Sequence, residues 1–224
     1  MDNASTDESA AVAESLGARV IRLDRNLGFG AANNVGFRAS NSSHIAFVNP
    51  DVRIAPDTLD LLANVADDEG ALVAPQLANP DGSMQPNGRG YPYLWSKVRN
   101  RFGDGTSENS YRRYASPGEV VNVVFAIGAA IAGRREDFAT LGGWDDHFFV
   151  YYEDSDLGLR ARVLGTRTVI VGSAVWVHGW ARETQGLNLR AWSREIPSML
   201  KFYTRYPWLL VPTGPVPTAY REPT

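Results

Sequence analysis

The sequence of 224 residues predicts an α/β fold in which a mostly parallel sheet is flanked by helices. Short apolar stretches with branched side chains alternate with amphipathic segments along the first half of the chain. Polar or glycine-containing turns follow several of these stretches, and ligands bind beyond such strand ends in parallel sheets. The composition, 44% hydrophobic and 21% charged, is that of an ordinary globular chain.

In the first half of the chain, helices and strands are predicted to alternate. Branched residues favour the strands, and an apolar face spaced at helical intervals favours the helix that begins near Pro56. Pro75 is expected to end the last strand of this half. The predicted elements are helices over residues 8–16, 31–39 and 56–66 and strands over residues 19–23, 44–48 and 71–74.

The regular pattern stops over residues 79–118, which are rich in Gly, Pro, Asn and Ser and contain scattered basic and aromatic residues. Such a long connection would suit an anionic, sugar-bearing ligand, or it could be a solvated loop. Regular structure is predicted again as strands over 120–132, 168–171 and 174–177, helices over 134–141 and 188–206, and a helix that starts at the acids of 153–156.

The helix predicted over residues 188–206 has two possible roles. Trp192, Ile196, Met199 and Tyr203 fall on one face, which could lie on a membrane surface or could cap the core. The sequence leaves both roles open. The proline-rich residues 213–224 are expected to fray.

Composition excludes several classes of function. The net charge of −3 provides no basic field, so we expect no nucleic acid partner. The absence of cysteine excludes a thiolate nucleophile, a disulfide framework and a cysteine zinc site. The longest apolar run, residues 120–132, is too short to span a bilayer, and the polar start of the chain does not resemble a signal peptide.

An acidic cluster adjoins an aromatic stretch within residues 142–165. Glu153, Asp154 and Asp156 fall at the start of the predicted helix, directly after a run of aromatic residues. Acids at this position can simply complement the helix dipole, at about 0.3–1 kcal/mol each. An apolar neighbourhood would instead raise the pKa of a carboxyl group, as a general base requires. The residues alone leave both alternatives open.

Three polar positions follow predicted strands. The loop over residues 25–30 could present backbone N–H groups to a phosphate, or it could be a tight turn. Asp51 could bind Mg²⁺ or Mn²⁺ on a diphosphate, or it could form an Asx-turn. His178 could be structural, or it could be a second metal ligand if the fold brings it near Asp51.

Taken in order, these motifs resemble the family 2 inverting glycosyltransferases of the GT-A fold, most closely the rhamnosyltransferase-like branch. The resemblance covers nearly the whole chain to about residue 206. The ordered motifs are Asp2-Asn3-Ala4-Ser5-Thr6-Asp7, Asn26-Leu27-Gly28-Phe29-Gly30-Ala31-Ala32-Asn33-Asn34, Asn49-Pro50-Asp51, Gly142-Gly143-Trp144-Asp145, Phe148-Phe149-Val150-Tyr151-Tyr152-Glu153-Asp154-Ser155-Asp156 and His178.

The resemblance implies a role for each matching residue. Asp51 would be the last acid of the family's metal motif, with His178 approaching the same Mg²⁺ or Mn²⁺, and Asp154 would be the general base beside Glu153. Asp2 would belong to the turn that contacts the nucleotide base. The residues expected to line the nucleotide-sugar pocket are Asn26, Gly28, Asn33 and Asn34, and those expected to contact the acceptor are Trp144, Asp145, Tyr152 and Asp156.

The activity implied is inverting transfer of a sugar, with L-rhamnose from dTDP-L-rhamnose the favoured donor. The expected acceptor is lipid-linked or a glycan, in cell-wall or surface polysaccharide synthesis. The expected location is the cytoplasm, with peripheral contact at the inner face of the membrane through residues 188–206. The alternatives are an inactive remnant that only binds a partner, and a phosphohydrolase that uses water as acceptor.

Against the family pattern, the chain begins inside the Asp-Asn motif, so the resemblance implies a fold that lacks its first βαβ unit. We expect one domain over residues 1–206, followed by a proline-rich tail over 207–224. Within the domain, residues 1–78 would be the remainder of the nucleotide-sugar half, 79–119 the long loop, 120–187 the acceptor half and 188–206 the last helix.

Overall fold

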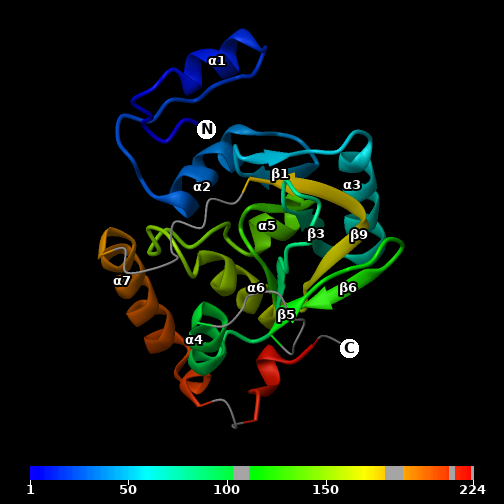
Figure 1. Cartoon of the computed structure of the whole chain (residues 1–224), viewed down its shortest axis with the longest axis vertical. Coiled ribbons are helices and arrows are strands. Elements are labelled where there is room, and N and C mark those ends of the chain that lie inside the picture. The colour runs from blue at the N-terminus through cyan, green and yellow to red at the C-terminus, as the bar shows by residue number, and fades with distance from the viewer. Residues whose placement is uncertain (103–110, 180–188, 212–214, 223–224) are drawn as a thin grey trace.

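The computed structural model describes residues 1–102, 111–179, 189–211 and 215–222 (Figure 1). A six-stranded sheet lies at its centre, with strand order β1-β8-β3-β9-β2 and with β6 also paired to β9. A smaller sheet has the order β5-β4-β7. The strands are β1 (His44–Val48), β2 (Val52–Arg53), β3 (Ala71–Ala78), β4 (Gly88–Arg89), β5 (Arg112–Arg113), β6 (Val120–Val123), β7 (Phe125–Ala126), β8 (Ala130–Arg134) and β9 (Arg167–His178).

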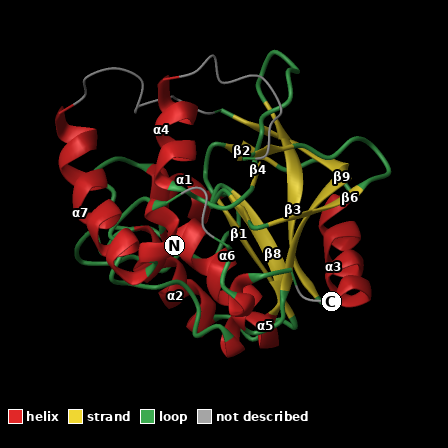
Figure 2. Cartoon of the chain, turned by 90° about the horizontal axis from the view of Figure 1, so that it is seen from below, coloured by secondary structure: helices red, strands yellow, loops and turns green. Residues whose placement is uncertain are grey.

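Helices cover both faces of the central sheet, with α3 on one face and α2, α5 and α6 on the other (Figure 2). Neighbouring residues of β3 point to opposite faces: Val73 packs in the same cluster as Leu62 of α3, and Leu72 packs in the same cluster as Phe138 of α5. The helices are α1 (Ser9–Ser15), α2 (Phe29–Ala39), α3 (Thr58–Glu69), α4 (Leu94–Phe102), α5 (Arg135–Thr140), α6 (Glu153–Val163), α7 (Leu189–Arg205) and the 3₁₀ helices η1 (Pro207–Leu210) and η2 (Thr218–Tyr220).

The predicted α/β class is confirmed, but the sheet is not mostly parallel. Among the named ladders of the described residues, only β3 with β9 is parallel. The strands β1, β3 and β9 do run in one direction, as the alternation with helices implied. However, β8 inserts between β1 and β3 and pairs antiparallel with both. Sequence pattern indicates where strands lie but not which strand enters between two others.

Several predicted elements differ in extent. Residues 19–23 form no strand, only an isolated bridge between Asp2 and Arg22. The single strand predicted over 120–132 is divided among β6, β7 and β8. A bend at Val124 separates β6 from β7, which belongs to the smaller sheet, and a turn at Gly128 returns the chain to the central sheet. Pro75 does not end β3; the register against β9 shifts between Pro75 and Gln76, and pairing continues to Ala78.

The last helix, α7, caps the core. Phe202, Tyr203 and Tyr206 are buried in one cluster with the partly buried Met199, whereas Ile196 is 41% exposed. The side chain of Trp192 lies outside the described part. The tail is not simply frayed, because Tyr220 of η2 packs on Tyr206 and Trp208 and its carbonyl accepts a hydrogen bond from Tyr91. Within the described residues, no helix combines the length and apolar character needed to cross a bilayer.

A close backbone contact holds α6 against β7. A Cβ atom added at Gly158 would lie 2.9 Å from Phe125 Cα and closer still to Val124 O. Gly158→Ala should therefore lower the free energy of unfolding by about 1–3 kcal/mol in urea denaturation. Gly36→Ala is the matched control, since a Cβ there meets only the flexible Met1 side chain. It should be neutral or stabilise by up to about 1 kcal/mol. Equal stability of the two variants would contradict this packing.

Candidate functional site

The carboxyl ends of β1, β3 and β9 meet at one edge of the sheet, because these three strands share a direction. Asp51 lies in the turn after β1, and His178 is the last residue of β9. His178 Nε2 lies 3.4 Å from Asp51 Oδ2, and the Gly179 N–H donates to the Asp51 carbonyl at 2.8 Å. The structure therefore meets the condition that His178 must lie near Asp51 to act as a second metal ligand.

The two side chains differ in exposure, which is 5% for His178 and 44% for Asp51. Burial lowers the pKa of His178, and the Asp51 carboxylate opposes this shift. His178 Nδ1 lies 2.9 Å from Gln85 Oε1, so Nε2 is the ring nitrogen turned to Asp51. An imidazole nitrogen and a carboxylate oxygen facing one another at an accessible edge fit a shared divalent cation.

The glycine loop before α2 is locked to the start of the chain. Asn3 Nδ2 donates to Asn26 Oδ1 and to the Gly28 carbonyl, and Asn3 Oδ1 accepts from the Leu27 N–H. Asn26 Oδ1 also accepts from the Gly28 N–H. Gly28 has φ +89° and leaves no room for a Cβ beside Phe149. Asn26 and Gly28, which were expected to line the nucleotide-sugar pocket, therefore form and stabilise the loop itself.

The other residues expected to contact the nucleotide sugar are Asn34, Asn33 and Asp2. Asn34 is buried, and its amide donates to the Trp144 carbonyl at 2.7 Å and accepts from the Trp144 N–H at 2.9 Å. Both of these hydrogen bonds hold the loop at Trp144. Asn33 Nδ2 is buried and has no hydrogen-bond partner among the described residues. Asp2 accepts from the Ser5 N–H at 3.1 Å, and hydrogen bonds from Ser5 lower the pKa of Asp2.

Glu153 and Asp154 open α6 in different environments. Glu153 is 7% exposed, and its Oε2 has no hydrogen-bond partner among the described residues. Burial, and then the charge of Asp154, raise the pKa of Glu153 to about 8. Asp154 is only partly buried, and its Oδ1 accepts from the Ser155 N–H at 2.6 Å. The aromatic neighbourhood was expected to raise the pKa of Asp154, the candidate base, whereas in the structure burial raises the pKa of its neighbour Glu153.

Lys97 of α4 is a site residue that the sequence pointed to only as one of several basic residues in the long connection. Its ammonium lies 3.6 Å from the centre of the Tyr152 ring and 3.4 Å from Ser155 Oγ. Burial lowers the pKa of Lys97 to about 8, and Asp154 and Glu153 act in the opposite direction. Asp154 also attracts the buried Arg89 of β4. Two cations thus stand near this carboxylate.

The four predicted acceptor residues are engaged within the protein. Asp156 is fully buried, and its carboxylate accepts from Arg160, Arg205 and Tyr206. Burial of a carboxylate requires such partners, so Asp156 anchors α7 to α6 and faces no open space. Trp144 and Tyr152 are 2% and 3% exposed and lie in core clusters.

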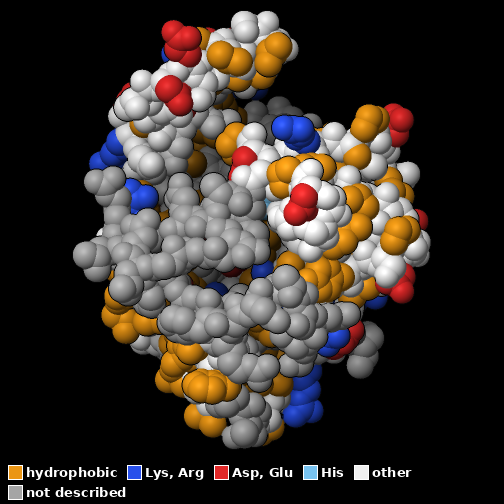
Figure 3. All heavy atoms as spheres, viewed as in Figure 1, with side chains coloured by type: hydrophobic (Ala, Val, Ile, Leu, Met, Phe, Trp, Pro, Cys, Tyr) orange, Lys and Arg blue, Asp and Glu red, His pale blue; other side chains and the backbone are white. Residues whose placement is uncertain are grey.

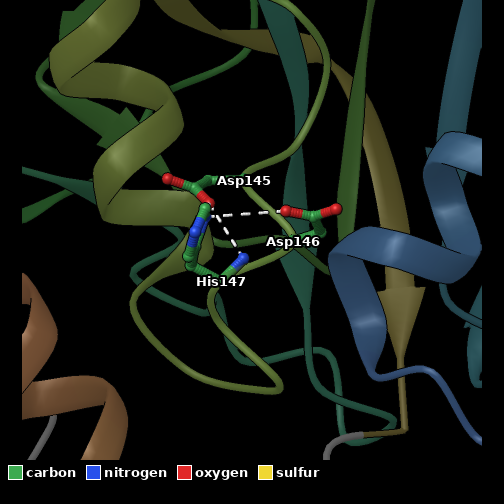
Figure 4. Close-up of side chains that lie close together, drawn as sticks. All are labelled: Asp145, Asp146 and His147. Carbon is green, nitrogen blue, oxygen red and sulfur yellow. Dashed lines mark hydrogen bonds and ion pairs between the residues drawn. The ribbon is translucent and has the colours of Figure 1, made fainter.

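Asp145 is the fourth of these residues and forms a small polar cluster with Asp146 and His147 (Figure 4). Its carboxylate accepts from the His147 N–H at 2.9 Å and pairs with Arg205. Burial alone would raise the pKa of Asp145, but the hydrogen bonds from His147 and Arg205 lower it to about 2. Because Arg205 pairs with this carboxylate and the His147 N–H donates to it, the arrangement is explained without a metal ion.

A series of contacts connects the Asp51 edge with the start of α6. The Asn49 N–H donates to the Ala129 carbonyl at 2.8 Å. The neighbouring Gly128 leaves room for the rings of Phe29 and Trp144, which pack edge to face. The Phe29 N–H then donates to the Phe149 carbonyl at 2.8 Å. These contacts join turns from distant parts of the sequence and end at Phe149, four residues before α6 begins.

Comparison with known families matches residues 1–142 to the model described as Glycosyl transferase family 2. Relatives in two strains of Mycobacterium tuberculosis, CDC 1551 / Oshkosh and H37Rv, are named N-acetylglucosaminyl-diphospho-decaprenol L-rhamnosyltransferase. Each is 30% identical over 203 residues, covering 82% of this chain and 66% of the relative's length. An O-antigen biosynthesis protein of Myxococcus xanthus is 26% identical and is matched over 14% of its length.

Solved structures of glycosyltransferases share the fold. A mannosyltransferase from Pyrobaculum calidifontis in complex with GDP-Man and Mn²⁺ superimposes with a TM-score of 0.59 at 17% identity, over 98% of this chain and 56% of that one. GalNAc-T7 with UDP, GalNAc and Mn²⁺ gives a TM-score of 0.58 at 16% identity, over 96% and 45%. These likenesses confirm the predicted GT-A fold.

The raised pKa of Glu153 predicts a pH-dependent stability. The pKa of Glu153 in the folded protein, about 8, exceeds the ordinary 4.5. The contribution of Glu153 to the free energy of unfolding is therefore fully present below pH 4.5 and is lost as the pH rises through 8. Glu153→Gln should remove this loss. Its advantage over wild type in urea denaturation should grow by up to about 1.4 kcal/mol per pH unit between these values.

Two controls isolate Glu153 in this experiment. Lys97, with its pKa lowered to about 8, contributes stability only as pH rises above that value, so the lower window excludes it. Glu136→Gln changes an exposed glutamate and should show no comparable slope. Parallel pH profiles for wild type and Glu153→Gln would show that Glu153 is ionised in the folded protein.

Proposed function

Since this chain belongs to glycosyl transferase family 2, we propose that it transfers a sugar from a nucleotide donor to an acceptor hydroxyl with inversion. The observation that carries this proposal is the approach of His178 to Asp51 at the strand edge. The acids at the start of α6 complete the proposed site. Asp51 and His178 would provide a place for the donor diphosphate, and the acids of α6 would provide a base for the acceptor hydroxyl.

The favoured donor is dTDP-L-rhamnose, and the favoured acceptor is lipid-linked or a glycan of the cell wall or cell surface. The names of the mycobacterial and Myxococcus relatives support this choice. The match spans less than two thirds of the length of those relatives, so donor and acceptor are part of the proposal. The division of the chain into one domain over residues 1–206 and a tail is part of it as well.

Asp51 and His178 would hold a Mg²⁺ or Mn²⁺ ion in this function. Their facing oxygen and nitrogen atoms suit such an ion, and two structural neighbours were solved with Mn²⁺. When bound, the ion would supply charge neutralisation to the leaving diphosphate. Asp2 would contact the nucleotide base. Asn33 Nδ2, which has no hydrogen-bond partner among the described residues, would donate a hydrogen bond to the nucleotide sugar.

Asp154 is the general base in this proposal, and Glu153 supports the site as a neutral acid. A base must be ionised at working pH, and the pKa of about 8 leaves Glu153 mostly protonated at neutral pH. Asp154 is partly accessible and stands near the cations of Lys97 and Arg89. Those cations and the Ser155 hydrogen bond hold the carboxylate while it accepts the proton of the acceptor hydroxyl.

Contact of α7 with a membrane surface is a further part of the proposal. Hydrophobic side chains lie along the lower left edge of the molecule, over α7 (Figure 3). Leu200 and Ile196 of α7 are 61% and 41% exposed, with the exposed basic residues Arg194 and Lys201 on the same helix. Exposed apolar residues beside basic ones favour the surface of an anionic bilayer.

The proposed roles predict that substitution of Asp154 impairs sugar transfer and that substitution of Asp51 impairs metal-dependent nucleotide binding. Asp154→Asn should lower transfer by about 10²–10⁴-fold while leaving nucleotide binding nearly unchanged, because the base does not touch the donor. Asp51→Ala should instead remove the Mn²⁺-dependent part of dTDP or UDP binding in isothermal titration. Weakened donor binding in Asp154→Asn would assign that residue to the donor site.

The membrane assignment is tested by a surface substitution, because deleting α7 would remove core residues. Leu200→Glu should reduce co-sedimentation with anionic phosphatidylglycerol vesicles at low salt. Val163→Glu introduces the same charge at a 48% exposed site at the end of α6 and should leave co-sedimentation unchanged. Equal co-sedimentation of both variants and wild type would contradict a contact through α7.

A further inference from the structure

We propose that Gln85 holds the His178 ring with its proton on Nδ1, so that the lone pair of Nε2 faces Asp51 and is available to a divalent cation. The part that concerns the cation rests on the proposed function, whereas the position of the proton does not. Gln85 is thus a positioning residue that acts through His178. It lies within residues 79–118, where the sequence showed no regular pattern.

One side chain holds both the ring and the backbone of His178. Gln85 Oε1 lies 2.9 Å from His178 Nδ1, and Gln85 Nε2 donates to the His178 carbonyl at 3.0 Å. Gln85 is 2% exposed and His178 4%, so water does not compete for these contacts. The Gln85 N–H also donates to the Leu77 carbonyl at 2.8 Å, which attaches it to the end of β3.

A chain of hydrogen bonds sets which atom of the Gln85 amide faces the ring. The Asp81 carboxylate only accepts, and the Ser83 hydroxyl donates its single proton to it at 2.6 Å. Ser83 Oγ must then accept from Asn79 Nδ2, at 2.8 Å. Asn79 Oδ1 is left to accept from Gln85 Nε2, at 2.7 Å. Gln85 Oε1 therefore faces His178.

This direction decides the tautomer of the ring. An amide oxygen beside Nδ1 can only accept, so Nδ1 carries the proton and Nε2 of the neutral ring has a lone pair. That lone pair faces Asp51 Oδ2 across 3.4 Å. Two acceptors facing one another repel unless a positive charge lies between them. The hydrogen bonds from Asp81 to Gln85 therefore preset His178 as a ligand before any ion arrives.

The first test measures the tautomer in the metal-free protein. Long-range ¹H–¹⁵N correlation spectra distinguish the two neutral tautomers, and the chain has only three histidines, which His44→Gln and His147→Gln assign. Wild type should show His178 with its proton on Nδ1. Gln85→Met should shift it toward Nε2, where it can donate to Asp51. A proton on Nε2 in wild type, or an unchanged tautomer in folded Gln85→Met, would overturn the inference.

Further variants separate positioning from stability. Gln85→Glu keeps an acceptor for Nδ1 and should keep the wild-type tautomer. Gln76→Met removes a fully buried glutamine that donates to the Gln85 carbonyl without touching the ring, and it should also keep that tautomer. Ser83→Ala, on the exposed turn, removes one member of the chain of hydrogen bonds, and it should keep the wild-type tautomer because Gln85 Nε2 still donates to the His178 carbonyl. If Gln85→Met does not fold, a proton on Nε2 in wild type still overturns the inference.

The second test measures the affinity for Mn²⁺ in the presence of UDP by electron paramagnetic resonance. Gln85→Met should weaken Mn²⁺ binding by about 10–100-fold, as loss of a partner of a metal-binding histidine does, whereas Gln85→Glu should not. Equal affinity in wild type and Gln85→Met would overturn the link to the cation. If wild type binds no Mn²⁺, the proposed cation site fails, whereas the tautomer result stands by itself.

Discussion

The parallel pairing of β3 with β9 is the constraint on which the candidate site depends. Ala78 pairs with Val177 in this register, so the turn that begins at Asn79 lies beside His178. On its other side β9 pairs with β2, where Val52 lies opposite His178 and Asp51 reaches Gly179. One strand end thus receives a carboxylate from one neighbour and a buried glutamine from the other.

The start of α6 depends on a second constraint, the burial of Asp156. A buried carboxylate is costly unless it is paired and hydrogen-bonded, and Arg160, Arg205 and Tyr206 supply those contacts. Because Arg205 and Tyr206 adjoin the end of α7, this one carboxylate joins two helices far apart in the sequence. The acidic cluster is therefore not three equivalent acids: Asp156 anchors α7, and only the pair before it remains for chemistry.

Local pattern predicted local structure well. The strand at His44–Val48 has the predicted bounds, and α3 is shifted by a few residues. Pairing across the sheet was not predictable, because antiparallel β8 enters between β1 and β3 from residues far along the chain. The residues that contact the acceptor could not be assigned, because the sequence does not show whether an aromatic or acidic side chain is buried or exposed to solvent.

The chemistry of each carboxylate follows from its partners. Asp156 is hydrogen-bonded to two arginines, and Asp51 faces an imidazole at an accessible edge. Glu153 keeps its proton at neutral pH because burial outweighs the attraction of Lys97. The same holds for His178. Gln85, in a segment with no regular sequence pattern, decides which ring nitrogen of His178 carries the proton. An acid or histidine motif therefore marks where ligands can lie, and the hydrogen bonds behind the motif decide which atom faces them.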